Sequence, residues 1–468
     1  MLFTSFVFLQ IFLPAVTLAN ICIRNIKWKN IFLLAASLFF YAWGEPNNIF
    51  LLIFSLFVNY VIACKGLKFE LSDRSRKWYL IAGLLFNLII LFIFKYTSPV
   101  MFFLDDMFHF SFKLSNIALP LGISFFTFQI ISYLLDTYRK ENLPQKNFFD
   151  LSLYIMFFPQ LVAGPIVKYH DIAEQLDQRA TSWSNYVCGI RRFVYGLGKK
   201  VLIANQMAYL ADEVFLIPGN VLDCKTAWLG IVAYSLQIYF DFSGYSDMAI
   251  GLGRMLGFKF KENFNLPYIS KSIQEFWRRW HISLSSWFKE YLYIPLGGSR
   301  KSAKRTYLNI MIVFITTGIW HGAGFNFVLW GAYYGVLLVL ERWQLKRFLE
   351  KPLFAPLAHI YTLLAVMLGW VFFRAETLPE AWSYCCKMFT FTNNAALPLK
   401  ELVTLPLVLL MAAAILFAGP IPLLKCFRSE IDREDVKWYD FIVQPVILVL
   451  VLMLLAGNTY NPFIYFRF

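Results

Sequence analysis

The stretch TYLNIMIVFITTGIWHGAGFNFVLWGAYYGVLLVL, residues 306–340, indicates both the fold and a candidate reactive group. Apolar runs at 308–319 and 327–340 flank the sequence Trp-His-Gly-Ala-Gly, in which the histidine is His321. A membrane-spanning helix needs about 20 apolar residues, so neither run is long enough to cross a bilayer alone. We therefore expect His321 to lie at membrane depth, beside glycines that allow close helix packing or a local break.

The rest of the chain has the composition of an integral membrane protein. Of its 468 residues, 59% are hydrophobic, 19% are aromatic and 15% are charged, and the mean hydropathy is +0.57. Soluble chains are roughly 45–50% apolar and about 25% charged, so this apolar surface is too large for a soluble core. We predict an all-α integral membrane protein of roughly ten to twelve transmembrane helices, with re-entrant or interfacial helices. The clearest apolar runs are 3–23, 31–43, 48–63, 78–96, 117–135, 148–163, 227–252, 306–340, 357–373, 402–424 and 439–457.

Basic residues are concentrated in one part of the chain. The formal net charge is +14, which in a soluble protein would suggest nucleic-acid binding but here follows from basic cytoplasmic loops. We expect one polytopic domain over residues 1–468, in which 254–305 is a basic, aromatic-rich interfacial or re-entrant segment. Its acidic residues are Glu262, Glu275 and Glu290, and its basic residues are Arg254, Lys259, Lys261, Lys271, Arg278, Arg279, Lys289, Arg300, Lys301, Lys304 and Arg305.

Within that segment the pattern predicts an amphipathic helix at the membrane interface. Ser272 and Glu275 form a capping-box pattern after Pro267, so we expect a helix to begin there. At about 100° per residue, one side of this helix is apolar and the other is polar. His281 lies on the apolar side, which is an unusual position for a histidine that has no functional role. The apolar side consists of Ile273, Trp277, Trp280, Leu284, Phe288 and Tyr291, and the polar side of Lys271, Arg278, Arg279, Ser285 and Lys289.

Two histidines and two aspartates are the main candidates for chemistry. Histidine ordinarily titrates near neutrality, and an ionisable group inside the hydrocarbon layer is a functional hypothesis by default. For His321 the competing interpretation is a neutral imidazole hydrogen-bonded between helices, and the residues alone leave the two interpretations equal. Asp241 and Asp247 lie inside an apolar run and need Arg or His partners. For Asp247 we expect an ion pair that fixes helix register, whereas for Asp241 a functional role and a register-fixing pair are both open.

The sequence gives no support for a metal site or a bound cofactor. The seven cysteines contain no CxxC pair, so neither a disulfide framework nor a thiolate zinc site is expected. His281 and His321 are far apart in the sequence and have no close carboxylate ligands. We therefore expect no metal at the site.

Several stretches carry more specific motifs. They are SLQIYFDFSGYSDMAIGLGRMLGF at 235–258, NFNLPYISKSIQEFWRRWHISLSSWFKEYLYIPLGG at 263–298, GIWHGAGFNFVLWGAYYG at 318–335 and FFPQLVAGPIVKYHDI at 157–172. Together they resemble the membrane-bound O-acyltransferase (MBOAT) family over nearly the whole chain. The resemblance is closest to the bacterial branch that O-acetylates alginate and other cell-surface polysaccharides, including peptidoglycan.

The resemblance implies roles for individual residues. His321 corresponds to the family's catalytic histidine and His281 to its second histidine, in a fold whose helices surround a thin centre with a tunnel. Trp320 and Asn326 would shape the site or polarise the thioester carbonyl. The other residues expected to bind substrate are Tyr239, Asp241, Trp277, Arg278 and Arg279.

The resemblance also implies a reaction. An acyl group, expected to be acetyl from acetyl-CoA, would move from the cytoplasm toward hydroxyls of a cell-surface polysaccharide. The expected partner is an extracytoplasmic esterase-like protein of the SGNH type, and the expected location is the bacterial cytoplasmic (inner) membrane. The alternatives are D-alanyl transfer to teichoic acids from a carrier protein, a non-enzymatic transporter or flippase, and an inactive scaffold. The lack of visible internal repeats counts against a transporter.

Overall fold

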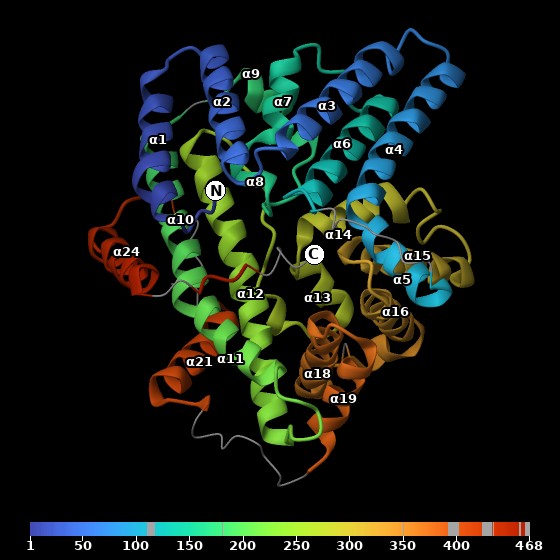
Figure 1. Ribbon diagram of the computed structural model, residues 1–468, viewed down its shortest axis with the longest axis vertical. Coiled ribbons are helices and arrows are strands. Elements are labelled where there is room, and N and C mark those ends of the chain that lie inside the picture. The colour runs from blue at the N-terminus through green and yellow to red at the C-terminus, as the bar shows by residue number, and fades with distance from the viewer. Residues whose placement is uncertain are drawn as a thin grey trace. The chain divides into compact units, whose positions relative to one another are not determined.

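The computed structural model describes residues 1–109, 118–179, 181–349, 351–391, 402–423, 433, 435–457 and 460–463. Within these ranges the secondary structure is helical and contains no strand (Figure 1). The chain divides into two compact units, and the division falls within helices α10 and α12. Unit 1 comprises Met1–Phe193, Ser246–Lys261 and Glu434–Lys437, and unit 2 comprises Val194–Tyr245, Glu262–Arg433 and Trp438–Phe468.

Unit 1 consists mainly of apolar helices from the first part of the chain. Helix α2 packs against α7, and α4 packs against α6. A short connection after Gly44 separates α2 from α3. The helices that begin in this unit are η1 (Phe8–Phe12), α1 (Leu13–Cys22), α2 (Ile26–Gly44), α3 (Asn48–Val61), η2 (Ile62–Gly66), α4 (Asp73–Lys95), α5 (Thr97–Phe108), α6 (Ile123–Tyr138), α7 (Phe148–Met156), α8 (Phe158–Leu161), α9 (Tyr169–Asp177) and α10 (Trp183–Gly198).

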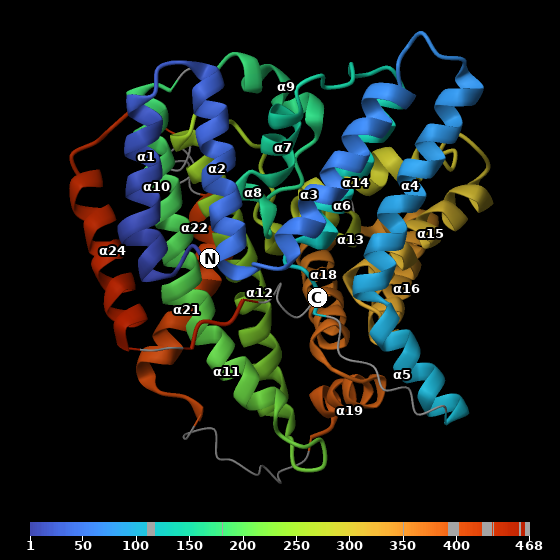
Figure 2. The same ribbon diagram turned by 45° about the horizontal axis from the view of Figure 1, so that its top comes forward.

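Unit 2 contains both candidate histidines. Helices α15 and α16 lie side by side, and α16 also packs against α18 (Figure 2). The helices that begin in this unit are η3 (Lys199–Ala204), α11 (Asn205–Phe215), α12 (Cys224–Met255), η4 (Pro267–Ile269), α13 (Ile273–Arg279), α14 (Ile282–Phe288), η5 (Lys289–Tyr293), α15 (Ala303–His321), α16 (Phe325–Leu340), η6 (Glu341–Leu345), α17 (Lys346–Leu349), η7 (Pro352–Phe354), α18 (Ala355–Arg374), α19 (Leu378–Phe389), α21 (Leu405–Ala418), α22 (Pro420–Leu423) and α24 (Asp440–Gly457).

The predicted all-α membrane architecture is confirmed by the helices of both units. Some helices are long and apolar enough to cross a bilayer, and two further apolar segments are shorter. The remaining predicted spans fall on helices that are shorter or more polar. Helix α12 is an example, because it has 32 residues but includes Asp241 and Asp247. The segments long and apolar enough to cross a bilayer are Asn48–Gly66, Asp73–Lys95, Pro352–Arg374 and Asp440–Gly457, and the shorter ones are Phe8–Cys22 and Leu405–Ala418.

The hairpin of α15 and α16 places His321 at its tip. Helix α15 ends at His321 because Gly322 adopts an extended backbone (φ −173°, ψ 165°). The two helices approach closely, since a Cβ atom on Gly318 would lie only 2.2 Å from the carbonyl oxygen of Phe327. Both roles predicted for these glycines, close packing and a local break, are therefore present in the hairpin.

The basic segment forms two short helices, and the prediction of one continuous amphipathic helix is wrong. Helices α13 and α14 are separated by His281, whose backbone is left-handed (φ 44°, ψ 56°). The predicted start is confirmed, because the Ser272 hydroxyl accepts a hydrogen bond from the Glu275 amide at 3.0 Å. A periodic pattern cannot reveal a break that contacts from another segment impose. The predicted apolar side is nevertheless buried throughout: Ile273, Trp277, Trp280, Leu284, Phe288 and Tyr291.

Candidate active site

Both histidines line one small cavity inside unit 2, which we call the histidine chamber. His281 comes from the junction of α13 and α14, and His321 ends α15. The chamber has a volume of about 20 Å³, which is room for about one water molecule. All of its lining residues are buried, and most are aromatic: Ile238, Phe242, Trp277, Trp280, His281, Leu284, His321, Trp330, Trp370 and Phe373.

Aromatic rings surround the imidazole of His321. Its ring centroid lies 4.8 Å from that of Trp320 and 5.1 Å from those of Trp330 and Phe373, each in an edge-to-face arrangement. These contacts restrict the orientation of the imidazole and keep water away from it. In such a dry environment, electrostatic interactions with a reacting group are stronger than in water. Among the described residues that line the chamber, the two histidines are the ionisable ones.

His281 is held in a strained conformation beside the chamber. A left-handed backbone costs a residue other than glycine about 1–2 kcal/mol, and such residues often occur at functional sites. The ring packs edge-on against Phe242 at 4.7 Å, and Nδ1 lies 3.1 Å from Oδ1 of Asn263. His281 lies outside the membrane-spanning helices, and burial lowers its pKa to about 3. The imidazole is therefore neutral at physiological pH.

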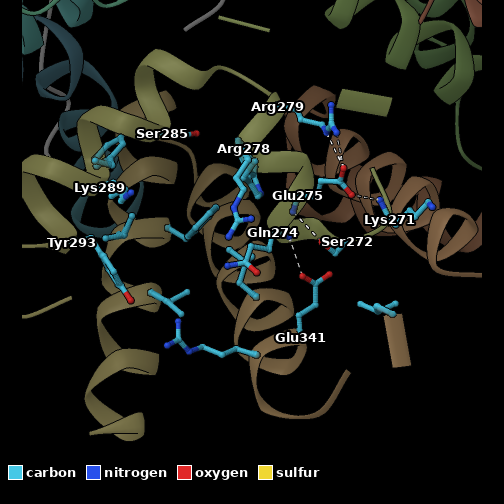
Figure 3. A pocket seen from close by; sticks show the side chains of 18 of the residues that line it. Lys271, Ser272, Gln274, Glu275, Arg278, Arg279, Ser285, Lys289, Tyr293 and Glu341 are labelled. Carbon is cyan, nitrogen blue, oxygen red and sulfur yellow. Dashed lines mark hydrogen bonds and ion pairs between the residues drawn. The ribbon is translucent and has the colours of Figure 1, made fainter. Parts of the chain in front are cut away.

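A second cavity of about 1300 Å³ lies along α13, and we call it the basic pocket (Figure 3). Arg279 is paired with Glu275 at 2.9 Å. Arg278, Lys289 and Arg342 form no ion pair within the described part of the chain, so these three cations can receive an anionic ligand. The basic residues that line the pocket are Lys271, Arg278, Arg279, Lys289, Arg342 and Lys351.

Glu341 fixes the start of α13 at the edge of this pocket. Its two carboxylate oxygens accept hydrogen bonds from the backbone amides of Ile273, at 2.6 Å, and Gln274, at 3.0 Å. Figure 3 shows Glu341 beside Gln274. A carboxylate at a helix N-terminus satisfies amides that have no partner within the helix. Glu341 thereby ties α13 to the end of α16 and sets the position of the residues that α13 places in the pocket.

Trp277 and Leu284 line both cavities. They come from α13 and α14, on either side of the break at His281. The Trp277 ring is held edge-on by Tyr334 at 5.0 Å and by Trp330 at 5.6 Å. The basic pocket and the histidine chamber are therefore neighbouring cavities that share these two side chains.

Two residues expected to shape the site lie just outside the chamber. Trp320 contacts the ring of His321 but does not line the cavity. The amide of Asn326 donates a hydrogen bond to the carbonyl oxygen of Ala375 at 2.9 Å. Asn326 therefore connects the start of α16 to the end of α18, and it does not line the chamber.

The two aspartates of α12 have the cationic partners that burial requires. Asp241 lies 2.7 Å from Nζ of Lys200 within unit 2, and Asp247 lies 2.7 Å from Arg192 within unit 1. Asp247 has the predicted arginine partner, and the cation described beside Asp241 is a lysine. Neither Asp241 nor Tyr239 is among the residues that line the histidine chamber or the basic pocket.

Sequence reasoning missed several residues of the site. Trp330 lies in the stretch 318–335, one helical turn after Asn326, but nothing in that stretch distinguishes it as a site residue. Trp370 and Phe373 come from α18, which is apolar throughout, so nothing in its pattern marks two of its residues as chamber lining. Asn263 also belongs to a selected motif, but its contact with His281 depends on the fold.

Comparison with known proteins gives matches over most of the chain. The profile described as MBOAT, membrane-bound O-acyltransferase family, matches residues 41–376. The probable alginate O-acetylase AlgI of Pseudomonas aeruginosa is 43% identical over 397 residues, which cover 84% of this chain and 75% of that protein. The probable alginate O-acetylase AlgI of Pseudomonas putida is 38% identical over 492 residues and the match covers 100% of both chains.

A relative named for a different polymer matches almost as well. The peptidoglycan O-acetyltransferase of Helicobacter pylori is 38% identical over 414 residues, which cover 81% of this chain and 78% of that protein. The profile match includes both His281 and His321, the residues that meet in the chamber. The chain therefore belongs to the membrane-bound O-acyltransferase family, and it is an acyltransferase of the membrane.

Proposed function

We propose that this chain transfers an acetyl group from a cytoplasmic thioester to a hydroxyl on the way to a cell-surface polysaccharide, with His321 as general base. The observation that carries the proposal is one buried chamber lined by both His281 and His321. Trp277 and Leu284 belong both to this chamber and to the basic pocket. The relatives named for O-acetylation of alginate and of peptidoglycan support a polysaccharide as the final acceptor.

The chemistry follows from a base held in a dry cavity. The acceptor oxygen attacks the thioester carbonyl carbon while His321 takes the hydroxyl proton. The new C–O bond forms, the C–S bond breaks, and the sulfur leaves with the electron pair and receives the proton from the imidazolium. A general base of this kind contributes about 10²–10⁴-fold to the rate. A chamber of about 20 Å³ suits a two-carbon acyl group better than a long chain.

The basic pocket supports acetyl-CoA as the donor. Its phosphates would bind cations of the pocket that form no ion pair within the described part of the chain, in particular Arg278, Lys289 and Arg342. The thioester would then reach the chamber beside Trp277, whose ring belongs to both cavities. In this arrangement Arg278 and Trp277 bind donor, while Arg279 holds Glu275 and with it the shape of α13.

Transfer from the cytoplasm to the outside requires a membrane location and an extracytoplasmic partner. The chain acts as one polytopic domain in the bacterial inner membrane, takes the acyl group on the cytoplasmic side and delivers it on the other side. A serine hydroxyl of an extracytoplasmic partner of the SGNH esterase type receives the group and passes it to the polymer. His321 in the chamber accepts and returns a proton during this transfer.

The test is chemical analysis of cell envelopes from a strain that lacks the chain. Complementation with the native protein should restore base-labile acetate on a surface polymer, whereas His321→Ala should not, at equal protein level in the membrane. His109→Asn is the matched control, because His109 is an exposed histidine with a left-handed backbone (φ 57°) that asparagine tolerates. Release of D-alanine instead of acetate would support D-alanyl transfer, and unchanged acetylation with His321→Ala would contradict the proposal.

A further inference from the structure

Asn263 makes polar contacts with His281 and Ser283 from outside helices α13 and α14. Asn263 lies in the connection between α12 and η4 and is completely buried. Its Oδ1 is 3.1 Å from Nδ1 of His281, 3.1 Å from the backbone nitrogen of Ser283 and 2.9 Å from the Ser283 hydroxyl. One side-chain oxygen thus serves three groups around the break between α13 and α14.

These contacts determine where the imidazole proton is. The backbone amide of Ser283 can only donate, so the Asn263 atom facing it must be the amide oxygen. An oxygen of this kind only accepts, so Nδ1 of His281 must carry a proton in order to bond to it. The Ser283 hydroxyl, 3.5 Å from Nδ1, gives its own proton to the same oxygen and can only accept from Nδ1.

The backbone of Asn263 also holds the strained turn. Its carbonyl oxygen accepts a hydrogen bond from the amide of Ile282 at 2.9 Å, directly after His281. Two residues later, the amide of Asn265 donates to the carbonyl oxygen of Arg279 at 2.9 Å. The two bonds bracket His281 and keep it at φ 44°, where the ring both lines the chamber and reaches Asn263.

We propose that Asn263 is a positioning residue that holds His281 as the neutral tautomer with the proton on Nδ1 and the lone pair on Nε2. His281 therefore acts in the chamber as a hydrogen-bond acceptor, toward the acceptor hydroxyl or toward an N–H of His321. It does not act as the donor that stabilises negative charge on the thioester oxygen. This role rests on the proposed function, but the tautomer itself can be tested without activity.

The first experiment observes the tautomer directly. The chain has five histidines, so ¹⁵N imidazole spectra of the full-length protein in lipid nanodiscs can be assigned by comparison with His281→Gln. We expect a protonated Nδ1 and a non-protonated Nε2 for His281 at neutral pH, and a mixture of tautomers in Asn263→Ala. A protonated Nε2 in the native protein would overturn the proposal.

The second experiment separates positioning from folding. Asn263→Asp keeps an acceptor oxygen for all three contacts, but its carboxylate should raise the pKa of His281. Protonation of His281, which removes its lone pair, then begins at a higher pH. The acidic limb of the pH–rate profile should therefore shift to higher pH, and the rate well above that pH should equal the native rate. Asp241 is already paired with Lys200, and the other ionisable group at the chamber is His321, which Asn263→Asp leaves in place.

Asn263→Ala should lower kcat by about 10- to 100-fold, the usual cost of losing a group that orients a reactive side chain. It should add little further loss in a protein that already carries His281→Gln. An unchanged pH profile in Asn263→Asp, with transfer still abolished by His321→Ala, would contradict the positioning role and leave the proposed function intact. Transfer that survives His321→Ala would instead contradict the proposed function.

Discussion

The two cavities of unit 2 differ in volume and in the chemical character of the side chains that line them. The histidine chamber has a volume of about 20 Å³ and a lining of buried, mainly aromatic side chains, whereas the basic pocket has about 1300 Å³ and six basic residues on its wall. Trp277 and Leu284 belong to the linings of both. Under the proposed function, the difference predicts a division of labour: the charged pocket recognises the donor, and His321 reacts in the chamber.

The largest expected effect comes from the chamber. His321→Gln keeps a polar side chain of similar length but has no basic group near neutral pH, so kcat should fall by about 10²–10⁴-fold. The KM for the donor should change little, because the donor's charged part binds in the basic pocket. Initial rates with labelled acetyl donor in proteoliposomes, measured over a range of donor concentrations, separate the two constants.

His109→Asn provides the control for replacing a histidine at a distance from both cavities, and it should leave both constants unchanged. A large rise in KM with an unchanged kcat in His321→Gln would place His321 in donor binding. The division of labour between chamber and pocket would then be wrong.

Some of this arrangement is predictable from the sequence, because it depends on local patterns. His321 stands out as an ionisable residue between apolar runs, and the glycines beside it predict close helix packing or a local break. The apolar side of the basic segment predicts which residues are buried, even though that segment is not one helix. The helical, membrane-embedded class follows from composition alone.

What the sequence does not show depends on partners distant along the chain. The break at His281 is held by Asn263, 18 residues earlier, and the start of α13 is held by Glu341, 68 residues after Ile273. A periodic pattern records which side of a helix is buried, but not which distant polar group ends it. Trp370 is similarly indistinguishable from the other apolar residues of α18 until the fold places it at the chamber.

A smaller effect is expected at the shared wall. Trp277→Leu removes part of the ring that separates the two cavities, so the chamber should admit a longer acyl group. The ratio of propionyl to acetyl transfer should rise by about tenfold or more, since one methylene in an apolar site is worth roughly 10- to 200-fold in discrimination. Competition between the two donors, with both products quantified by mass spectrometry, gives this ratio directly.

Trp343→Leu is the matched control, because Trp343 is 61% exposed and lines neither cavity. Its selectivity should equal that of the native protein. If Trp277→Leu reduced both transfers equally, Trp277 would support the fold without limiting the size of the acyl group.

The smallest effect is expected in the basic pocket. Arg278→Gln removes an exposed cation that has no acidic partner within the described part of the chain. One exposed ionic contact is worth up to about 1 kcal/mol, so KM for the donor should rise by at most about fivefold with kcat unchanged. The difference should disappear at high salt, because the screening length falls to about 3 Å at 1 M.

Lys225→Gln removes the same charge from an exposed position of α12 outside both cavities and controls for the change in net charge. A KM increase in both variants would assign the effect to the general positive charge of the protein, because only a local contact distinguishes Arg278 from Lys225. A fall in kcat with unchanged KM would mean that α13 transmits the loss of Arg278 to the chamber through Trp277. The basic pocket and the histidine chamber would then act as one site, because losing a charge in the pocket would affect the histidines through the Trp277 ring that lines both cavities.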